Sequence, residues 1–228
     1  MAETNNPSAP TDVGYAQPTL PLPTHGLYVL TSDNLSAAAL PPAVDAAIQG
    51  GAVLVQYRNK RLPAAAKLAL GQCLRKLCRE RNVPFIVNDD VALATELDAD
   101  GVHLGKDDAG IVEARRVLGN DAIIGVSCYN SLDLARQAAA MGADYVAFGR
   151  FFPSSTKPLA SPAAVETLQR ARAELSIPLV AIGGITPANG AALLAGGADF
   201  LAVIEGVFGQ TEPEVAAKAY AALWEARR

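Results

Sequence analysis

Short apolar runs alternate with longer Ala- and Leu-rich segments from Gly26 to the end of the chain. The runs are rich in Val, Ile and Leu and are bounded by Gly or Pro, which is typical of strands buried in a parallel sheet. We expect strands at residues 26–31, 52–57, 84–87, 100–104, 122–126, 143–148, 178–182 and 199–203. The intervening segments predict helices at 41–49, 63–82 and 91–97, one ending at 118, and others at 131–141, up to 175, at 187–194 and from 213 onward.

Strand–helix units that follow one another in a single run predict one closed domain. Alternating strands and helices form parallel sheets, and eight such units close a (β/α)8 barrel, an α/β fold of the TIM-barrel type. Glycine recurs where a helix ends and a strand begins, at residues 49–52, 140–144 and 195–199, as expected of left-handed helix C-caps. A doubly wound open sheet is the alternative, but it usually has fewer units and a Gly-rich first turn, which this sequence lacks.

The first 24 residues differ from the rest in composition. They are rich in proline, with Pro7, Pro10, Pro18, Pro21 and Pro23, and show no periodic apolar pattern. Segments of this kind seldom contribute to a core, so we expect a flexible N-terminal tail at residues 1–24. The barrel would then form a single domain over residues 25–228.

Composition narrows the function classes. Half of the residues are hydrophobic and 18% are charged, which indicates a globular chain, and the net charge of -4 argues against nucleic acid or an anionic membrane as a partner. No apolar run is long enough to span a membrane, and no secretory signal is visible. The spacing of the three cysteines does not suggest a set of disulfides, so Cys73, Cys78 and Cys128 are expected to be reduced thiols of a cytoplasmic protein. A homo-oligomer is possible. Cys128 has no adjacent His, so a thiol nucleophile is not expected.

The end of the expected strand at residues 52–57 carries the first candidate chemistry. Alternate side chains of a strand point to the same face, so Gln56, Arg58 and Lys60 should lie together at its carboxyl end. Cations cannot be buried there without a partner, and Arg and Lys both bind phosphate oxygens well. We interpret this face as a binding site for a phosphorylated substrate; the alternative is that the strand simply ends in a solvated loop.

Polar groups also follow the other expected strands, at the end where barrels carry their active sites. They are Asn88 and Asp89, then Asp107 and Asp108, then Ser127, then Ser154, Ser155, Thr156 and Lys157, and finally Gly183 and Gly184. Carboxylates from two adjacent strands, Asp89 with Asp107 or Asp108, suit Mg²⁺, which prefers one or two carboxylates plus substrate phosphates. The hydroxyls at 154–156 and the glycine pair would hold a second anion. The rim therefore predicts two phosphorylated groups and one metal ion.

Structural roles are open for several of these residues. Residues 88–90 could cap the next helix, and residues 107–108 could complement its dipole. The loop at 154–157 could be a solvated turn. We expect His103 to be packed rather than catalytic, and Tyr57 to face the helix layer.

Taken together, these motifs resemble the thiamine phosphate synthase family. The family's recurring pieces stand here as Gln56-Tyr57-Arg58-Asn59-Lys60, Asn88-Asp89, His103-Leu104-Gly105-Lys106-Asp107-Asp108, Gly125-Val126-Ser127, Pro153-Ser154-Ser155-Thr156-Lys157 and Gly183-Gly184-Ile185. The likeness runs from about Gly26 to Val207, in order, with one motif per strand.

The resemblance implies a reaction that joins 4-amino-2-methyl-5-hydroxymethylpyrimidine diphosphate to 4-methyl-5-(2-phosphoethyl)thiazole, giving thiamine phosphate and diphosphate. It implies catalytic roles for Arg58, Lys60, Ser127 and Lys157. The residues that it assigns to the pyrimidine diphosphate are Gln56, Tyr57, Arg58, Asn59, Lys60, Asn88, Ser127 and Lys157. Those assigned to the thiazole phosphate are Ser154, Ser155, Thr156, Gly184, Ile204 and Glu205, and one Mg²⁺ per site falls to Asp89 and Asp108. A dissociative loss of diphosphate would need no strong general base.

Two departures from the family pattern bear on function. Glu205 stands where the family usually has Ser, and Ser154 stands where Thr is common. A carboxylate aimed at a phosphate would repel it, so either Glu205 points away and backbone amides bind, or the thiazole phosphate binds weakly. Two alternatives on the same barrel are therefore kept: a thiazole tautomerase and a non-catalytic regulator of the thiamine pathway.

Overall fold

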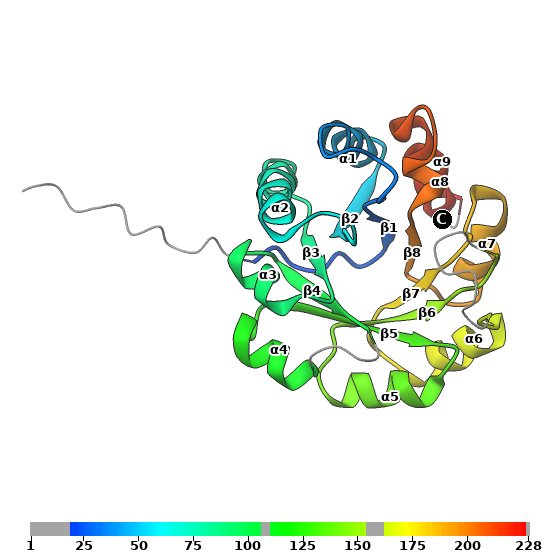
Figure 1. Cartoon of the computed structure of the whole chain (residues 1–228). Coiled ribbons are helices and arrows are strands. Elements are labelled where there is room, and N and C mark those ends of the chain that lie inside the picture. Colours follow the sequence, from blue (N-terminus) through cyan, green and yellow to red (C-terminus); the bar gives the residue numbers. More distant parts are fainter. Residues whose placement is uncertain (1–18, 106–109, 154–161, 227–228) are drawn as a thin grey trace, which may run out of the picture.

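The computed structural model describes residues 19–105, 110–153 and 162–226, and these form a closed parallel barrel surrounded by helices (Figure 1). Neighbouring strands follow chain order from β1 to β8, and β8 pairs with β1 to close the ring. The strands are β1 Gly26–Leu30, β2 Ala52–Tyr57, β3 Phe85–Asn88, β4 Gly101–Leu104, β5 Ile123–Tyr129, β6 Tyr145–Gly149, β7 Leu179–Ile182 and β8 Phe200–Val203. The predicted (β/α)8 barrel is confirmed.

The helices lie on the outside of the barrel, as expected for crossover connections between parallel strands (Figure 1). They are α1 Leu40–Gln49, α2 Ala64–Glu80, α3 Val91–Glu96, α4 Ile111–Leu118, α5 Leu132–Ala140, α6 Val165–Glu174, α7 Pro187–Ala195, α8 Glu205–Phe208 and α9 Pro213–Glu225. The short α8 was not predicted, and β5 runs three residues past the expected end at Val126, through the polar Ser127. No helix among the described residues is long and apolar enough to cross a membrane.

Two apolar layers hold the barrel together, because each strand is covered on both faces. The inner layer fills the barrel with side chains that include Tyr28, Leu54, Ile86, Tyr145 and Phe200. The outer layer packs the other face of the strands against the helices. The interior of the barrel is thus filled by side chains, so ligands can bind only at its rim.

Two residues at the inner end of the predicted tail at 1–24 contact the barrel. The Leu20 backbone N–H donates to the fully buried carboxylate of Asp100, and Leu22 packs against the inner apolar layer. Figure 1 shows this blue segment running along the barrel from the side of β4 towards β1. Residues 1–18 lie outside the described part of the chain. Leu20 and Leu22 are thus held against the barrel by Asp100 and by the inner apolar layer.

The beginning and the end of the barrel meet at one carbonyl group. The Asp199 carbonyl oxygen, just before β8, accepts hydrogen bonds from the Gly26 backbone N–H at 3.1 Å and from the Trp224 indole N–H at 3.2 Å. Helix α9 also packs on α1 and on β1. This meeting point lies where β1 and β8 begin, at the opposite end from the polar rim.

Candidate active site

A pocket of about 450 Å³ opens at the carboxyl ends of the strands. All eight strands contribute to its lining, with side chains such as Leu30 from β1, Ala147 from β6 and Ala202 from β8 forming its floor. The volume falls within the range of small-molecule sites. The candidate active site is therefore this pocket, at the rim that the polar strand ends predict.

The end of β2 delivers its alternate side chains into this pocket, as expected. Gln56, Arg58 and Lys60 all line it. Tyr57 points the other way: it is buried, stacks on Phe85, and its hydroxyl donates to the carbonyl of Lys67 in α2. The packing against the helix layer expected from strand alternation is confirmed. Tyr57 does not line the main pocket but lines a neighbouring hollow, and the substrate contact that the resemblance implies for it stays a prediction.

Asn59 is also turned away from the main pocket. Its side-chain oxygen accepts hydrogen bonds from the backbone N–H groups of Arg61 and Leu62 and so stabilises the turn after β2. It lines a neighbouring hollow of about 510 Å³ that Lys60 and Asp89 share with the main pocket. Asn59 thus shapes the turn that carries Lys60, and the direct substrate contact implied for it stays a prediction.

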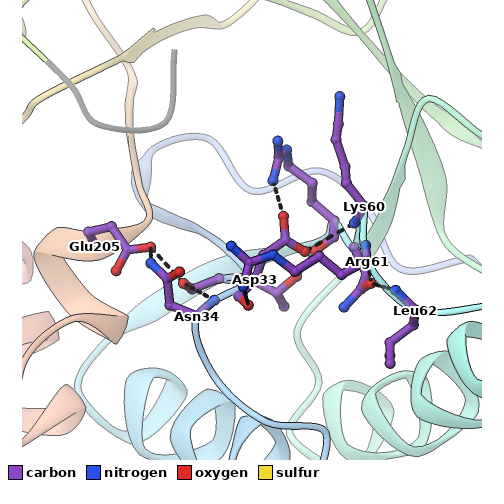
Figure 2. A network of polar contacts seen from close by, with 10 residues as sticks. Asp33, Asn34, Lys60, Arg61, Leu62 and Glu205 are labelled. Carbon is purple, nitrogen blue, oxygen red and sulfur yellow. Dashed lines mark hydrogen bonds and ion pairs between the residues drawn. The ribbon is translucent and has the colours of Figure 1, made fainter. Parts of the chain in front are cut away.

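Asp33, in the loop after β1, holds the cationic end of β2 in place (Figure 2). One carboxylate oxygen pairs with the Arg58 guanidinium at 2.8 Å, and the other accepts the Lys60 backbone N–H at 3.0 Å. The carbonyl oxygen of Asp33 also accepts from Arg61. Because both partners of the ion pair are mostly shielded from water, the guanidinium is fixed beside the pocket.

Glu205, the first residue of α8, is tied to the same loop (Figure 2). Its carboxylate accepts hydrogen bonds from the Ser32 hydroxyl at 2.6 Å and from the Asn34 side-chain amide at 3.1 Å. The carboxylate thus has donors of its own at the edge of the pocket. The loop after β1 therefore joins the end of β2 to the end of β8.

Acidic and amide groups follow β3. Asn88 and Asp89 line the pocket, whereas Asp90 caps α3 by accepting the Leu93 backbone N–H. The capping role considered for residues 88–90 is thus filled by Asp90. Asp89 has a positive φ of 65°, a conformation that Asp tolerates better than most residues and that often occurs at functional sites. Asp107 and Asp108 lie outside the described residues, and among the described residues no cluster of three acidic, His or Cys side chains forms a metal site by itself.

A chain of polar side chains crosses the floor of the pocket. The Gln56 amide nitrogen lies 2.6 Å from the Tyr28 hydroxyl, which lies 2.8 Å from the Tyr145 hydroxyl. The Tyr145 hydroxyl lies 3.0 Å from His103 Nδ1, and His103 Nε2 lies 2.9 Å from the Ser127 hydroxyl. His103 is packed, as predicted, but it also lines the pocket, which sequence reasoning missed.

The loops after β6, β7 and β8 complete the rim. Gly183 and Gly184 have positive φ angles, and a Cβ atom on Gly184 would lie 2.3 Å from the Pro153 carbonyl oxygen. Glycine is needed because these two loops touch backbone to backbone. Gly184 and Ile204 line the pocket, as does Arg150, which was not predicted. Ser154, Ser155, Thr156 and Lys157 lie outside the described residues.

Cys128, the cysteine beside Ser127, is poorly suited to act as a nucleophile. Cys128 is buried, and burial raises the pKa of its thiol to about 12. A thiol with that pKa is protonated at neutral pH and is a poor nucleophile.

Comparison with known proteins places the chain among well-matched relatives. The family model described as thiamine monophosphate synthase matches residues 27–207. A thiamine-phosphate synthase of Methylococcus capsulatus is 50% identical over 92% of this chain and 93% of its own. One of Azoarcus sp. is 52% identical over 87% and 97%. The solved structure of a thiamine phosphate pyrophosphorylase from Pyrococcus furiosus has a TM-score of 0.80 at 35% identity, covering 89% of this chain and 96% of that chain.

Proposed function

Because this chain belongs to the thiamine monophosphate synthase family, we propose that its pocket joins 4-amino-2-methyl-5-hydroxymethylpyrimidine diphosphate to 4-methyl-5-(2-phosphoethyl)thiazole. The activity that goes with the family is that of a transferase that forms thiamine phosphate. One observation supports these substrates above all. The end of β2 carries two cations suited to a diphosphate, Arg58 and Lys60, beside the buried oxygen of Gln56, which can accept a hydrogen bond from an amino group.

The pyrimidine diphosphate is proposed to bind at the end of β2. The side-chain oxygen of Gln56 is buried and has no hydrogen-bond partner among the described residues, although it lines the pocket. An unsatisfied buried carbonyl oxygen is costly, and a ring amino group would satisfy it. Arg58 keeps further N–H donors beyond the one on Asp33, and Lys60 adds a second cation for the phosphates. Asn88 and Ser127 complete this half, together with Lys157.

The donors at the rim fit one Mg²⁺ ion held largely by the substrate. Asp89 is a pocket-lining carboxylate beside Asn88, and Mg²⁺ binds through one or two carboxylates plus phosphate oxygens. Asp108 is the second carboxylate proposed. When bound, Mg²⁺ would neutralise phosphate charge and make diphosphate a better leaving group. Arg58 and Lys60 would share in that neutralisation from the side of β2.

The thiazole phosphate is proposed to bind on the other side of the pocket. Gly183 and Gly184 allow close approach to the backbone after β7, a usual phosphate position in these barrels. Ile204 adds a backbone group after β8, and residues 154–156 add hydroxyls. The Glu205 carboxylate already accepts hydrogen bonds from Ser32 and Asn34, so its negative charge is partly balanced by these donors. This arrangement favours phosphate binding through backbone amides.

The proposed substitution is dissociative. Diphosphate departs from a carbon attached to an electron-rich aminopyrimidine, and the thiazole nitrogen attacks that carbon. The chain contributes positioning and charge neutralisation, which are large effects when both substrates are held in line. A base is not required at the reacting atoms, which agrees with a pocket whose one histidine is engaged by Tyr145 and Ser127.

The test is a reaction with both phosphorylated substrates and Mg²⁺, followed by chromatography for thiamine phosphate. We expect product from the wild-type chain and a loss of about a hundredfold or more in kcat/KM for Arg58→Ala, since a charge opposite the leaving group is removed. Arg81→Ala, which removes an exposed Arg paired with Asp45 on the outside of the barrel, is the matched control. Binding of both substrates without product would instead identify a regulator, and turnover of the thiazole alone a tautomerase.

A further inference from the structure

We infer that Tyr28, Tyr145 and His103 are positioning residues that fix the direction of hydrogen bonding at both ends of the pocket floor. The structure connects Gln56 on β2 to Ser127 on β5 through these three side chains by four hydrogen bonds of 2.6–3.0 Å. In this arrangement Gln56 must offer an acceptor to the pocket and Ser127 must offer a donor. The inference rests on the proposed function, because it states how the pyrimidine diphosphate is recognised.

The direction of this series of hydrogen bonds is inferred by counting the hydrogens that each side chain can donate. The Gln56 amide nitrogen can only donate, so the Tyr28 oxygen accepts from it. Either tyrosine could donate to the other, and we infer that Tyr28 donates to Tyr145, because the Tyr145 hydroxyl is the other hydrogen-bond partner of the Tyr28 hydroxyl. Tyr145 then donates to His103 Nδ1, which leaves the imidazole hydrogen on Nε2 to be donated to the Ser127 oxygen. Burial raises the pKa of both tyrosine hydroxyls above the usual tyrosine value, so each retains the one hydrogen that this count requires.

The two ends of the chain match the proposed substrate. The Ser127 hydroxyl hydrogen is left to point at an acceptor, such as a phosphate oxygen or a ring nitrogen. The Gln56 carbonyl oxygen, which has no partner among the described residues, is left to accept from an amino group. If every hydrogen bond ran the other way, Ser127 would present lone pairs to a phosphate and Gln56 would present N–H groups to an amino group. One direction therefore satisfies both ends, and the other satisfies neither.

The barrel is shaped to keep this chain in place. A Cβ atom on Gly125 of β5 would lie 1.9 Å from the Tyr145 ring, so that glycine makes the space in which the ring lies. The Tyr145 ring packs edge to face on Tyr28 and nearly parallel to His103, with ring centroids 5.9 Å and 5.6 Å apart. Tyr28, Tyr145 and Gln56 are each almost completely buried. Rotations that would reverse the chain thus have little room.

The tautomer of His103 reports the direction, and NMR can read it. The chain has two histidines, so the full-length protein labelled with ¹⁵N-histidine gives two sets of imidazole signals, and His25→Asn removes the set from the exposed His25. We expect His103 to be neutral with its hydrogen on Nε2. A hydrogen on Nδ1, or on both nitrogens, would overturn the inference.

Variants connect the tautomer to binding. Tyr145→Phe removes the donor to Nδ1, so we expect mixed tautomers and about a tenfold higher KM for the pyrimidine diphosphate, with the KM for the thiazole phosphate unchanged. His103→Gln, which keeps an N–H for Ser127, should retain more affinity than His103→Leu. Tyr220→Phe also loses a buried hydroxyl hydrogen bond, to the Ile185 carbonyl, and controls for stability alone.

The outcomes separate this inference from the proposed function. Thiamine phosphate formed by a wild-type protein whose His103 carries its hydrogen on Nδ1 would refute the inference and leave the function intact. The Nε2–H tautomer in a protein that forms no product would do the reverse. A Tyr145→Phe variant with unchanged tautomer and unchanged KM would also refute the inference, and if that variant does not fold, the wild-type spectrum decides.

Discussion

Replacing Asp33 by Ala should both destabilise the barrel and weaken the grip on the pyrimidine diphosphate. Asp33 pairs with Arg58 at 2.8 Å, and the side chains of the two partners are only 15% and 13% exposed. The same carboxylate accepts the backbone N–H of Lys60. Asp33→Ala therefore leaves a mostly buried guanidinium without its partner and a backbone donor without its acceptor.

The size of the effect can be worked from this geometry. At 2.8 Å and an effective dielectric constant of about 20, the two charges attract by about 6 kcal/mol before the cost of desolvation is subtracted. Breaking a fully buried pair typically costs 3–5 kcal/mol. Because this pair retains some contact with water, we expect a loss of about 2–3 kcal/mol in the free energy of unfolding. For a chain of this length that corresponds to a melting temperature lower by about 5–10 °C.

Thermal unfolding followed by circular dichroism measures the stability, and steady-state kinetics measure the KM for the pyrimidine diphosphate. Asp33→Asn keeps an acceptor for Lys60 and should lose only part of the stability. Asp45→Ala is the matched control, because Asp45 also pairs with an arginine, Arg81, but that arginine is 44% exposed on the outer surface, and this variant should lower the melting temperature by less than Asp33→Ala does. Equal shifts for Asp33→Ala and Asp45→Ala, or an unchanged KM in Asp33→Ala, would refute the reasoning.

Three further predictions concern the metal, the thiols and the N-terminal segment. Asp89→Asn should raise the Mg²⁺ concentration needed for half-maximal activity by about tenfold or more, and an unchanged metal titration would reject Asp89 as a ligand. Iodoacetamide at pH 8 should label the exposed Cys73 but not Cys128, because burial raises the pKa of Cys128 to about 12 and keeps it protonated; mass spectrometry of the folded protein shows which thiol reacts. Deleting residues 1–24 should lower the unfolding free energy by about 2 kcal/mol relative to deleting 1–18, since Leu20 and Leu22 are then lost, and equal melting curves would contradict this.

Strand order and the position of the rim could be predicted because they depend on local pattern. Apolar runs bounded by Gly and Pro predict the strands. Gln56, Arg58 and Lys60 are alternate residues, which predicts that they share one face. Short or polar extensions carry no such signal: β5 continues through Ser127, and α8 is a single turn without a side-chain cap.

The partners of the site residues could not be predicted, because they depend on how distant segments meet. Tyr28 and Tyr145 sit in runs that look apolar, and only closure of the barrel brings their hydroxyls together across its interior. The contacts of Asp33 depend on where the loop after β1 lies relative to the turn after β2. The motif resemblance assigned Tyr57 to the substrate because it treats residues 56–60 as one block, whereas strand alternation places Tyr57 on the opposite face.

The meeting of Gly26 and Trp224 on the Asp199 carbonyl makes this barrel suited to circular permutation. A short engineered linker could join Trp224 to Gly26 there, at the cost of the contacts that Leu20 and Leu22 make with the barrel, and new termini could be cut into another helix-to-strand turn on the same side. Every such rearrangement would leave the strand-to-helix loops around the pocket uncut, so the order of the units along the gene could be changed without altering the candidate active site.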